Sequence, residues 1–241
     1  MYSGRDAAEM IKCAKDNNVL LMEAMWTRFF PIIDTLREII ISGRAGKVLS
    51  VHSAFSYRAE LDKKSRLFDP MLAGGGLLDV GVYPLHFSDI VYDSVPLDIF
   101  GYADLGTDEN HIEVDEQASI IAQYSGCATA VMSCGIRTDM PGTAVIYASE
   151  ATITVPDFWK PTKLVIQFYD NKTEKFEKNV GIINHSYIDE GFQYEIRHMC
   201  GCIQAGAVES PVMTYEKSLS IMRLCDKLRK QWKLKYPFET Q

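Results

Sequence analysis

A run of three glycines followed by an apolar segment, GGGLLDVGVYPLH over residues 74–86, constrains the fold of this chain more than any other stretch. Glycine frees the backbone from ordinary steric limits, so a triplet allows close approach to a helix start or a ligand. The apolar segment is interrupted by one carboxylate, Asp79, and four residues later by one phenol, Tyr83. A helix over 77–92 places these two side chains on one face, one turn apart. Pro84 predicts a kink or a late helix start at that point.

The pair Asp79 and Tyr83 has two interpretations. A phenol beside a carboxylate in a cleft is suited to donate and relay protons to a hydroxyl or carbonyl substrate. The commoner alternative is a buried core helix whose Asp and Tyr bond to nearby backbone. The segment alone leaves both interpretations open.

Composition narrows the class of protein. The chain has 241 residues, enough for one large or two small domains, and its 47% hydrophobic and 24% charged residues are ordinary for a soluble globular protein. The net charge is −7 and the sequence has no long Lys/Arg block, so nucleic acid is not an expected partner. No apolar run approaches the length of a membrane span, and residues 1–16 lack the apolar core of a signal peptide. We therefore expect a cytoplasmic protein without a membrane partner.

The cysteines and histidines do not predict a metal site. Six cysteines are scattered without zinc-ligand spacing, and the one C-x-C, at Cys200 and Cys202, has no second close pair. The five histidines also lack ligand spacing. We expect reduced, half-buried thiols and no metal.

The first part of the chain has the pattern of half an αβ unit. Ser3 is suited to cap a helix over 5–17, and the apolar residues 19–22 predict a short buried strand directly after it. A helix over 32–42 begins behind Pro31, and a strand is expected over 47–57.

The rest of the chain predicts an α/β protein with an α+β second half. We expect a mostly antiparallel, open-faced sheet of about five or six strands there, with helices on one face. Residues 125–126 carry the sequence Ser-Gly, which is typical of a hairpin turn. The expected strands cover 97–103, 114–124, 127–137, 144–155 and 163–169, the helices 188–205 and 215–232, and the loops 60–70 and 104–113.

Two strings of residues carry a resemblance to a known family. The string EAMWTRFFP over 23–31, followed by GGGLLDVGVY over 74–83, resembles the Gfo/Idh/MocA oxidoreductases, in particular their diol dehydrogenase branch. The resemblance implies a Rossmann nucleotide-binding domain, of which residues 1–22 are the C-terminal remnant, and a substrate and dimerisation domain over 23–241. It also implies hydride transfer between NADP(H), or alternatively NAD(H), and a diol or sugar-like substrate.

The resemblance assigns roles to five residues. Tyr83 matches the catalytic acid/base and Asp79 the carboxylate beside it, while Trp26, Phe55 and Arg28 match substrate-binding positions. Without the resemblance, Phe55 is equally typical of a residue in the core of a strand. Trp26 and Arg28 are equally typical of a packed aromatic side chain and its surface partner. A free phenol has a pKa near 10, and the family lowers it with the lysine of an E-K-P motif.

The sequence departs from the family pattern in the nucleotide site. It contains no G-x-G-x-x-G, and spacing from Trp26 places the E-K-P lysine upstream of Met1. We therefore expect a truncated chain whose cofactor-binding residues are unknown and which is inactive by itself. The alternative function is a non-catalytic short form that dimerises or binds a full-length partner. Apolar residues on more than one face of the expected strands predict a homodimer.

Overall fold

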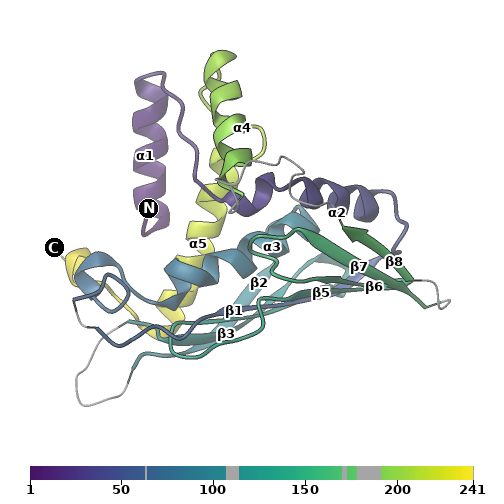
Figure 1. Cartoon of the computed structure of the whole chain (residues 1–241). Helices are drawn as coiled ribbons and strands as arrows, with labels where there is room; N and C mark the ends of the chain where they lie inside the picture. The colour runs from purple at the N-terminus through teal and green to yellow at the C-terminus, as the bar shows by residue number, and fades with distance from the viewer. Residues whose placement is uncertain (63, 107–113, 170–172, 178–190, 241) are drawn as a thin grey trace.

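The computed structural model describes residues 1–62, 64–106, 114–169, 173–177 and 191–240 of the chain, which form a sheet with helices on one side (Figure 1). The eight strands are β1 Val48–Ser56, β2 Asp98–Asp104, β3 Gln117–Gln123, β4 Thr129–Gly135, β5 Ala144–Ala148, β6 Ala151–Val155, β7 Lys163–Phe168 and β8 Thr173–Glu177. The α-helices are α1 Gly4–Asp16, α2 Pro31–Ile41, α3 Val82–Tyr92, α4 Phe192–Gln204 and α5 Tyr215–Trp232. Shorter helical turns are η1 Trp26–Phe29, η2 Pro70–Leu72, η3 Leu77–Gly81, η4 Ser125–Cys127 and η5 Pro237–Thr240.

The sheet is mostly antiparallel, as the sequence predicts. Its strand order is β2-β3-β4-β1-β5-β6-β7-β8, and among these neighbours β1 and β4 form the parallel pair. Val51 lies at the centre, paired with Ala130 of β4 and Ile146 of β5. The sheet has eight strands rather than five or six, because β1 from the first half joins it, residues 144–155 form two strands and β8 pairs with β7.

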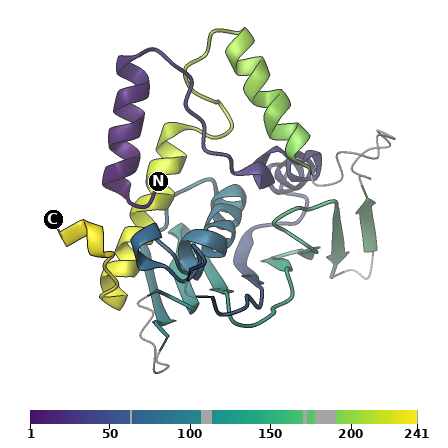
Figure 2. The same ribbon diagram turned by 60° about the vertical axis from the view of Figure 1, so that its left-hand side comes forward.

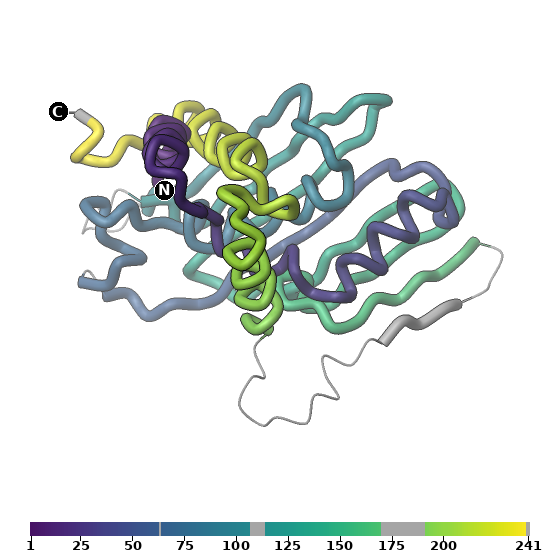
Figure 3. The backbone as a smooth tube through the Cα atoms, turned by 90° about the horizontal axis from the view of Figure 1, so that it is seen from above, coloured from purple at the N-terminus to yellow at the C-terminus, as the bar shows by residue number. Residues whose placement is uncertain are grey.

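The helices divide into two groups (Figures 1 and 2). Helices α2, α3 and α5 lie on the sheet: α3 packs on β1 and β4, α5 on β2 and α2 on β7. Seen from above in Figure 3, α2 and α5 lie over opposite halves of the sheet. Helices α1 and α4 rise away from the sheet, α1 packed on α5 and α4 on η1. No helix in the described part of the chain is both long and apolar enough to cross a bilayer.

The other face of the sheet carries an exposed apolar row formed by Phe100, Ile121 and Val131. These three residues are direct cross-strand neighbours on β2, β3 and β4. All three are exposed, whereas the alternate residues Ile120 and Met132 point to the helices and are buried. The strands are therefore apolar on both faces.

The expected strand over 19–22 is wrong. Leu21 makes one isolated bridge to Glu209, and Val19 is 52% exposed. A single bridge does not form a ladder, so the segment stays extended without joining a sheet. The helix before it is confirmed as α1, with Ser3 accepting the Asp6 N–H at its start.

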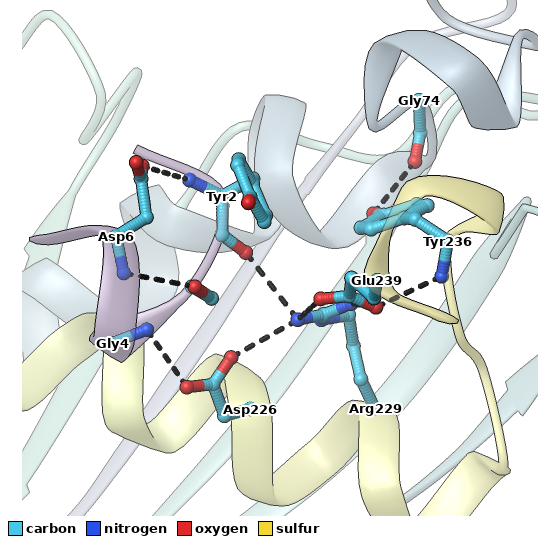
Figure 4. A network of polar contacts seen from close by, with 9 residues as sticks. Tyr2, Gly4, Asp6, Gly74, Asp226, Arg229, Tyr236 and Glu239 are labelled. Atoms are coloured by element: carbon cyan, nitrogen blue, oxygen red, sulfur yellow. Dashed lines mark hydrogen bonds and ion pairs between the residues drawn. The ribbon is translucent and has the colours of Figure 1, made fainter. Parts of the chain in front are cut away.

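A polar network ties the two ends of the chain to the glycine triplet (Figure 4). Arg229 of α5 is 5% exposed and donates to both oxygens of Glu239 and to the carbonyl of Tyr2. The hydroxyl of Tyr236 donates to the carbonyl of Gly74 at 2.9 Å. Arg229 also donates to Asp226 at 3.0 Å, so its buried charge is paired with two carboxylates.

Candidate active site

The glycine triplet receives the backbone and carboxyl group of Asp115. Gly75 has φ +116°, and a Cβ added there would lie 2.2 Å from Asp115 Oδ1. Asp115 Oδ2 accepts the N–H of Leu77 at 2.5 Å, and its carbonyl accepts the N–H of Gly76 at 2.6 Å. The glycines therefore allow close approach at a helix start, one of the two predicted uses. Complete burial raises the pKa of the Asp115 carboxyl to about 7.

The helix predicted over 77–92 is confirmed. It begins with the π-helical turn η3 and continues without a break as α3, so Pro84 falls in the first turn of the α-helix, where its missing N–H is tolerated. Gly81 lies directly on β4, because a Cβ there would be 2.8 Å from the sulfur of Cys134. This contact holds the helix, and Tyr83 with it, against the sheet.

Tyr83 contacts Trp26 and Phe55, two of the residues to which the resemblance assigns substrate binding. The indole N–H of Trp26, in η1, donates to the phenol oxygen at 3.2 Å. The ring of Phe55, on β1, lies edge to face with the Tyr83 ring, with 5.2 Å between centroids. Tyr83 itself is half-buried.

Two further rings complete this aromatic cluster, and sequence analysis missed both. Trp159 stacks on Phe55 at 4.9 Å and 7°, and Phe192, at the start of α4, stacks on Trp26 at 4.3 Å and 18°. The carbonyl of Trp159 accepts the Thr27 hydroxyl at 2.6 Å, which fixes the ring beside η1. No motif or periodic pattern in the sequence around Trp159 or Phe192 indicates that either residue belongs to the site. We use "aromatic cluster" below for Trp26, Phe55, Tyr83, Trp159 and Phe192.

Asp79 is bonded to residues other than Tyr83. Its Oδ2 accepts the hydroxyl of Tyr57 and its Oδ1 the guanidinium of Arg66, both at 2.7 Å. Burial, together with the bond to Asp79, raises the pKa of Tyr57. The effect of Asp79 on Tyr83 acts through space, because its negative charge raises the pKa of that phenol.

The pKa of Tyr83 lies above its ordinary value. Burial is the largest cause, the charges of Asp79 and Glu195 add to it, and the bond from Trp26 opposes it by favouring phenolate. Tyr83 is therefore a protonated phenol at neutral pH, a hydrogen-bond and proton donor. No E-K-P string, whose lysine would lower this pKa, occurs in the sequence.

Arg28 lies in the protein interior rather than beside the phenol of Tyr83. Its side chain is 0% exposed, so the interpretation as a surface partner of Trp26 is wrong. The guanidinium donates to His86 Nδ1 at 3.0–3.2 Å and pairs with Asp89, which also binds Lys217 at 3.2 Å. Burial lowers the pKa of His86 well below its usual range, so this ring is neutral. Arg28 thus holds η1 on α3.

The helix start behind the glycine triplet does not offer a phosphate site. The glycine-flanked helix start at Leu77 is filled by the carboxyl group of Asp115, which excludes a phosphate from it. Among the described residues, no group of three His, Cys, Asp or Glu side chains is arranged to hold a metal ion. The six cysteines are free thiols, three of them exposed.

Known sequences match most of this chain. The GFO/IDH/MocA C-terminal domain pattern matches residues 33–154. A trans-1,2-dihydrobenzene-1,2-diol dehydrogenase from Xenopus tropicalis is 32% identical over 236 residues, which are 95% of this chain and 68% of that protein. The Mus musculus protein of the same name is 28% identical over 96% of this chain and 68% of its own length.

Solved structures share the fold. An aldose-aldose oxidoreductase from Caulobacter crescentus, complexed with glycerol, has a TM-score of 0.84 at 17% identity, covering 97% of this chain and 68% of that one. A 3-ketoreductase from Actinomadura kijaniata with NADP and TDP-benzene has a TM-score of 0.82 at 18% identity, covering 96% of this chain and 68% of that one. An inositol dehydrogenase homologue from Azotobacter vinelandii with NAD+ has a TM-score of 0.79 at 15% identity, covering 96% of this chain and 67% of that one. By sequence and by fold, this chain belongs to the Gfo/Idh/MocA family of oxidoreductases.

Proposed function

We propose that this chain is the substrate-binding and proton-transferring part of an NADP-dependent oxidoreductase that acts on a diol or a sugar-like hydroxyl or carbonyl compound. The observation that carries the proposal is the phenol of Tyr83, bonded to Trp26 and surrounded by the aromatic cluster. The relatives are dehydrogenases of a ring diol, and the solved structures include complexes with NADP and with NAD+.

Tyr83 handles the proton. A nicotinamide supplies or accepts the hydride in such reactions, and the phenol gives its proton to the oxygen of a carbonyl or takes one from a hydroxyl. The raised pKa of Tyr83 suits donation, while the bond from Trp26 favours the phenolate that the reverse direction needs. The flat rings hold a ring-shaped substrate and exclude water.

Asp79 and Arg28 act on the site indirectly. The carboxylate of Asp79, fixed by Tyr57 and Arg66, sets the charge near the phenol. Arg28 positions η1 and therefore Trp26. In this proposal, residues 1–22 belong to the dinucleotide-binding unit and 23–241 to the substrate and dimerisation unit.

The exposed apolar row supports a second element of the proposal, a homodimer. Phe100, Ile121 and Val131 form a flat apolar surface on the sheet face opposite the helices. Contiguous apolar surface of this kind is typical of association sites. A two-fold dimer that places sheet against sheet covers it. The same face is available to a non-catalytic form that binds a full-length partner.

A Tyr83→Phe substitution tests the catalytic proposal. The N-terminal segment of a family relative, which carries the glycine turn and the E-K-P lysine, is fused to the N-terminus of this chain. Turnover of a diol by the fusion protein is then measured with NADP. Loss of general acid–base catalysis lowers kcat by about 10²–10⁴-fold. NADP affinity stays unchanged, because the phenyl ring keeps its packing.

Tyr102→Phe is the matched control, since Tyr102 is exposed on β2 away from the aromatic cluster. A kcat for Tyr83→Phe within about threefold of the parent, far from the loss expected of a proton donor, would show that Tyr83 is only structural.

A further inference from the structure

The first turns of α4 bring a carboxyl group to the aromatic cluster. Helix α4 packs against η1 through one face. On this face Phe192 stacks on Trp26, and His198 lies 4.9 Å from the ring of Phe29. Glu195 is placed between Phe192 and His198 in the helix, three residues from each, and therefore on the same face.

The side chain of Glu195 is buried and incompletely bonded. The residue is 9% exposed, and its Oε2 is inaccessible to solvent and has no hydrogen-bond partner. Buried carboxylate oxygens are normally bonded, because leaving one unpaired costs on the order of 1–3 kcal/mol or more. Asp79 differs in this respect, since each of its oxygens has a partner. Glu195 therefore has an acceptor that the protein itself does not use.

Glu195 lies within electrostatic range of the Tyr83 phenol. Its negative charge raises the pKa of Tyr83, and burial raises the pKa of Glu195 itself. The two groups belong to different elements, Tyr83 to α3 and Glu195 to α4. Trp26 lies between these elements, bonded to Tyr83 and stacked on Phe192.

We propose that Glu195 is a substrate-binding residue, whose side chain changes rotamer to expose its unpaired oxygen and then accepts a hydrogen bond from the second hydroxyl of a vicinal diol while the first faces Tyr83. The inference rests on the proposed function and adds to it the part of the site that selects a diol over a simple alcohol. A carboxylate suits this task because it accepts hydrogen bonds without donating, and a hydroxyl is a donor of matching size.

The preference for a diol over a simple alcohol can be measured by the intrinsic tryptophan fluorescence of the chain by itself. The chain has three tryptophans, two of which, Trp26 and Trp159, belong to the aromatic cluster. Titration with trans-1,2-cyclohexanediol and with cyclohexanol gives two dissociation constants, and their ratio is the diol preference. A hydrogen bond to a charged group is worth about 1.5–3 kcal/mol, or roughly 10–100-fold in affinity.

The expected result is a preference for the diol in the parent chain that falls by about tenfold or more in Glu195→Gln, with cyclohexanol binding nearly unchanged. Glu195→Asp, one methylene shorter, keeps the charge but also loses most of the preference. Glu38→Gln, which makes the same change at an exposed position of α2, leaves the ratio as in the parent. Circular dichroism confirms that each variant is folded.

Two outcomes separate this inference from the function on which it rests. If both alcohols bind and the ratio is the same in the parent, Glu195→Gln and Glu195→Asp, the role of Glu195 is overturned and the proposed function stands. If neither alcohol changes the fluorescence of the folded parent, the proposed substrate class fails together with the inference.

Discussion

The indole N–H of Trp26 donates a hydrogen bond to the phenol oxygen of Tyr83 at 3.2 Å, although the two residues are 57 positions apart in the chain. A donor at this oxygen stabilises phenolate, whereas burial of the same phenol stabilises the neutral form. Burial is the larger effect, so the pKa of Tyr83 stays above its ordinary value. Trp26 thus tunes the group that we assign to proton transfer and also packs on Phe192.

Trp26→Phe is expected to raise the pKa of Tyr83 further, because the variant keeps a ring in the stack but loses the N–H donor. Tyrosine labelled with ¹³C at Cζ reports ionisation by NMR, and Tyr83→Phe identifies the signal. Trp232→Phe is the control, since this indole donates to the carbonyl of Gly101 away from the site. An unchanged titration of Tyr83 in Trp26→Phe would show that the bond does not influence its ionisation.

The buried carboxyl of Asp115 is expected to make folding stability depend on pH. Its pKa rises from an ordinary 3.8 to about 7, so the folded state holds a proton that the unfolded state has lost between these values. Stability from this group is fully present below pH 4 and is lost as pH rises to 7. At about 1.36 kcal/mol per pKa unit, the loss is at most about 4 kcal/mol.

Urea unfolding at pH 5 and pH 8 checks this prediction. Asp115→Asn keeps an oxygen for the Leu77 N–H and has no charge to bury, so the difference in unfolding free energy between the two pH values should shrink. Asp16→Asn, at an exposed position of α1, should retain the parent's difference. Equal pH dependence in the parent and Asp115→Asn would contradict the raised pKa.

Arg28→Met is expected to lower the free energy of unfolding by about 3–5 kcal/mol, because it leaves the Asp89 carboxylate without its buried partner. Lys217→Met removes the more exposed partner of the same carboxylate and should cost about 1 kcal/mol or less. Chemical denaturation of both variants gives the comparison. If Arg28→Met lowered the free energy of unfolding no more than Lys217→Met does, Arg28 would not be the residue that holds η1 on α3.

Val131→Asp is expected to dissociate the proposed homodimer, because it buries a charge at one end of the exposed apolar row, directly beside Ile121. Sedimentation velocity should give a dimer for the parent and a monomer for the variant. Ile41→Asp introduces the same charge at an exposed position of α2, on the helical side, and should remain dimeric. A parent that is monomeric at micromolar concentration would refute the sheet-to-sheet dimer.

The chain by itself is expected to bind NADPH only weakly, because it has no G-x-G-x-x-G and the helix start at Leu77 already holds the Asp115 carboxyl group. Titration of NADPH fluorescence with the purified chain measures the affinity. A dissociation constant in the low micromolar range would require a nucleotide site that neither the sequence nor the described residues suggest.

Local signals in the sequence determined where the helices and hairpins form. Ser3 caps α1 and Pro31 begins α2 as predicted, and Thr214 caps α5 in the same way. The turn at Ser125 and Gly126 joins β3 to β4, with Gly126 at φ +67°. These features depend on contacts within a few residues, which the sequence displays directly. The sequence therefore predicted the fold class and the helix that carries Tyr83.

Only the tertiary structure decided which side chains meet. It brought Trp159 and Phe192 to the rings of Phe55 and Trp26, and directed Arg28 into the interior. It also gave Asp79 partners other than Tyr83 and left an oxygen of Glu195 unbonded. Each of these facts depends on how separate elements pack. Burial and hydrogen bonding between distant segments are set by the whole core, and no periodic pattern of residues in the sequence predicts them.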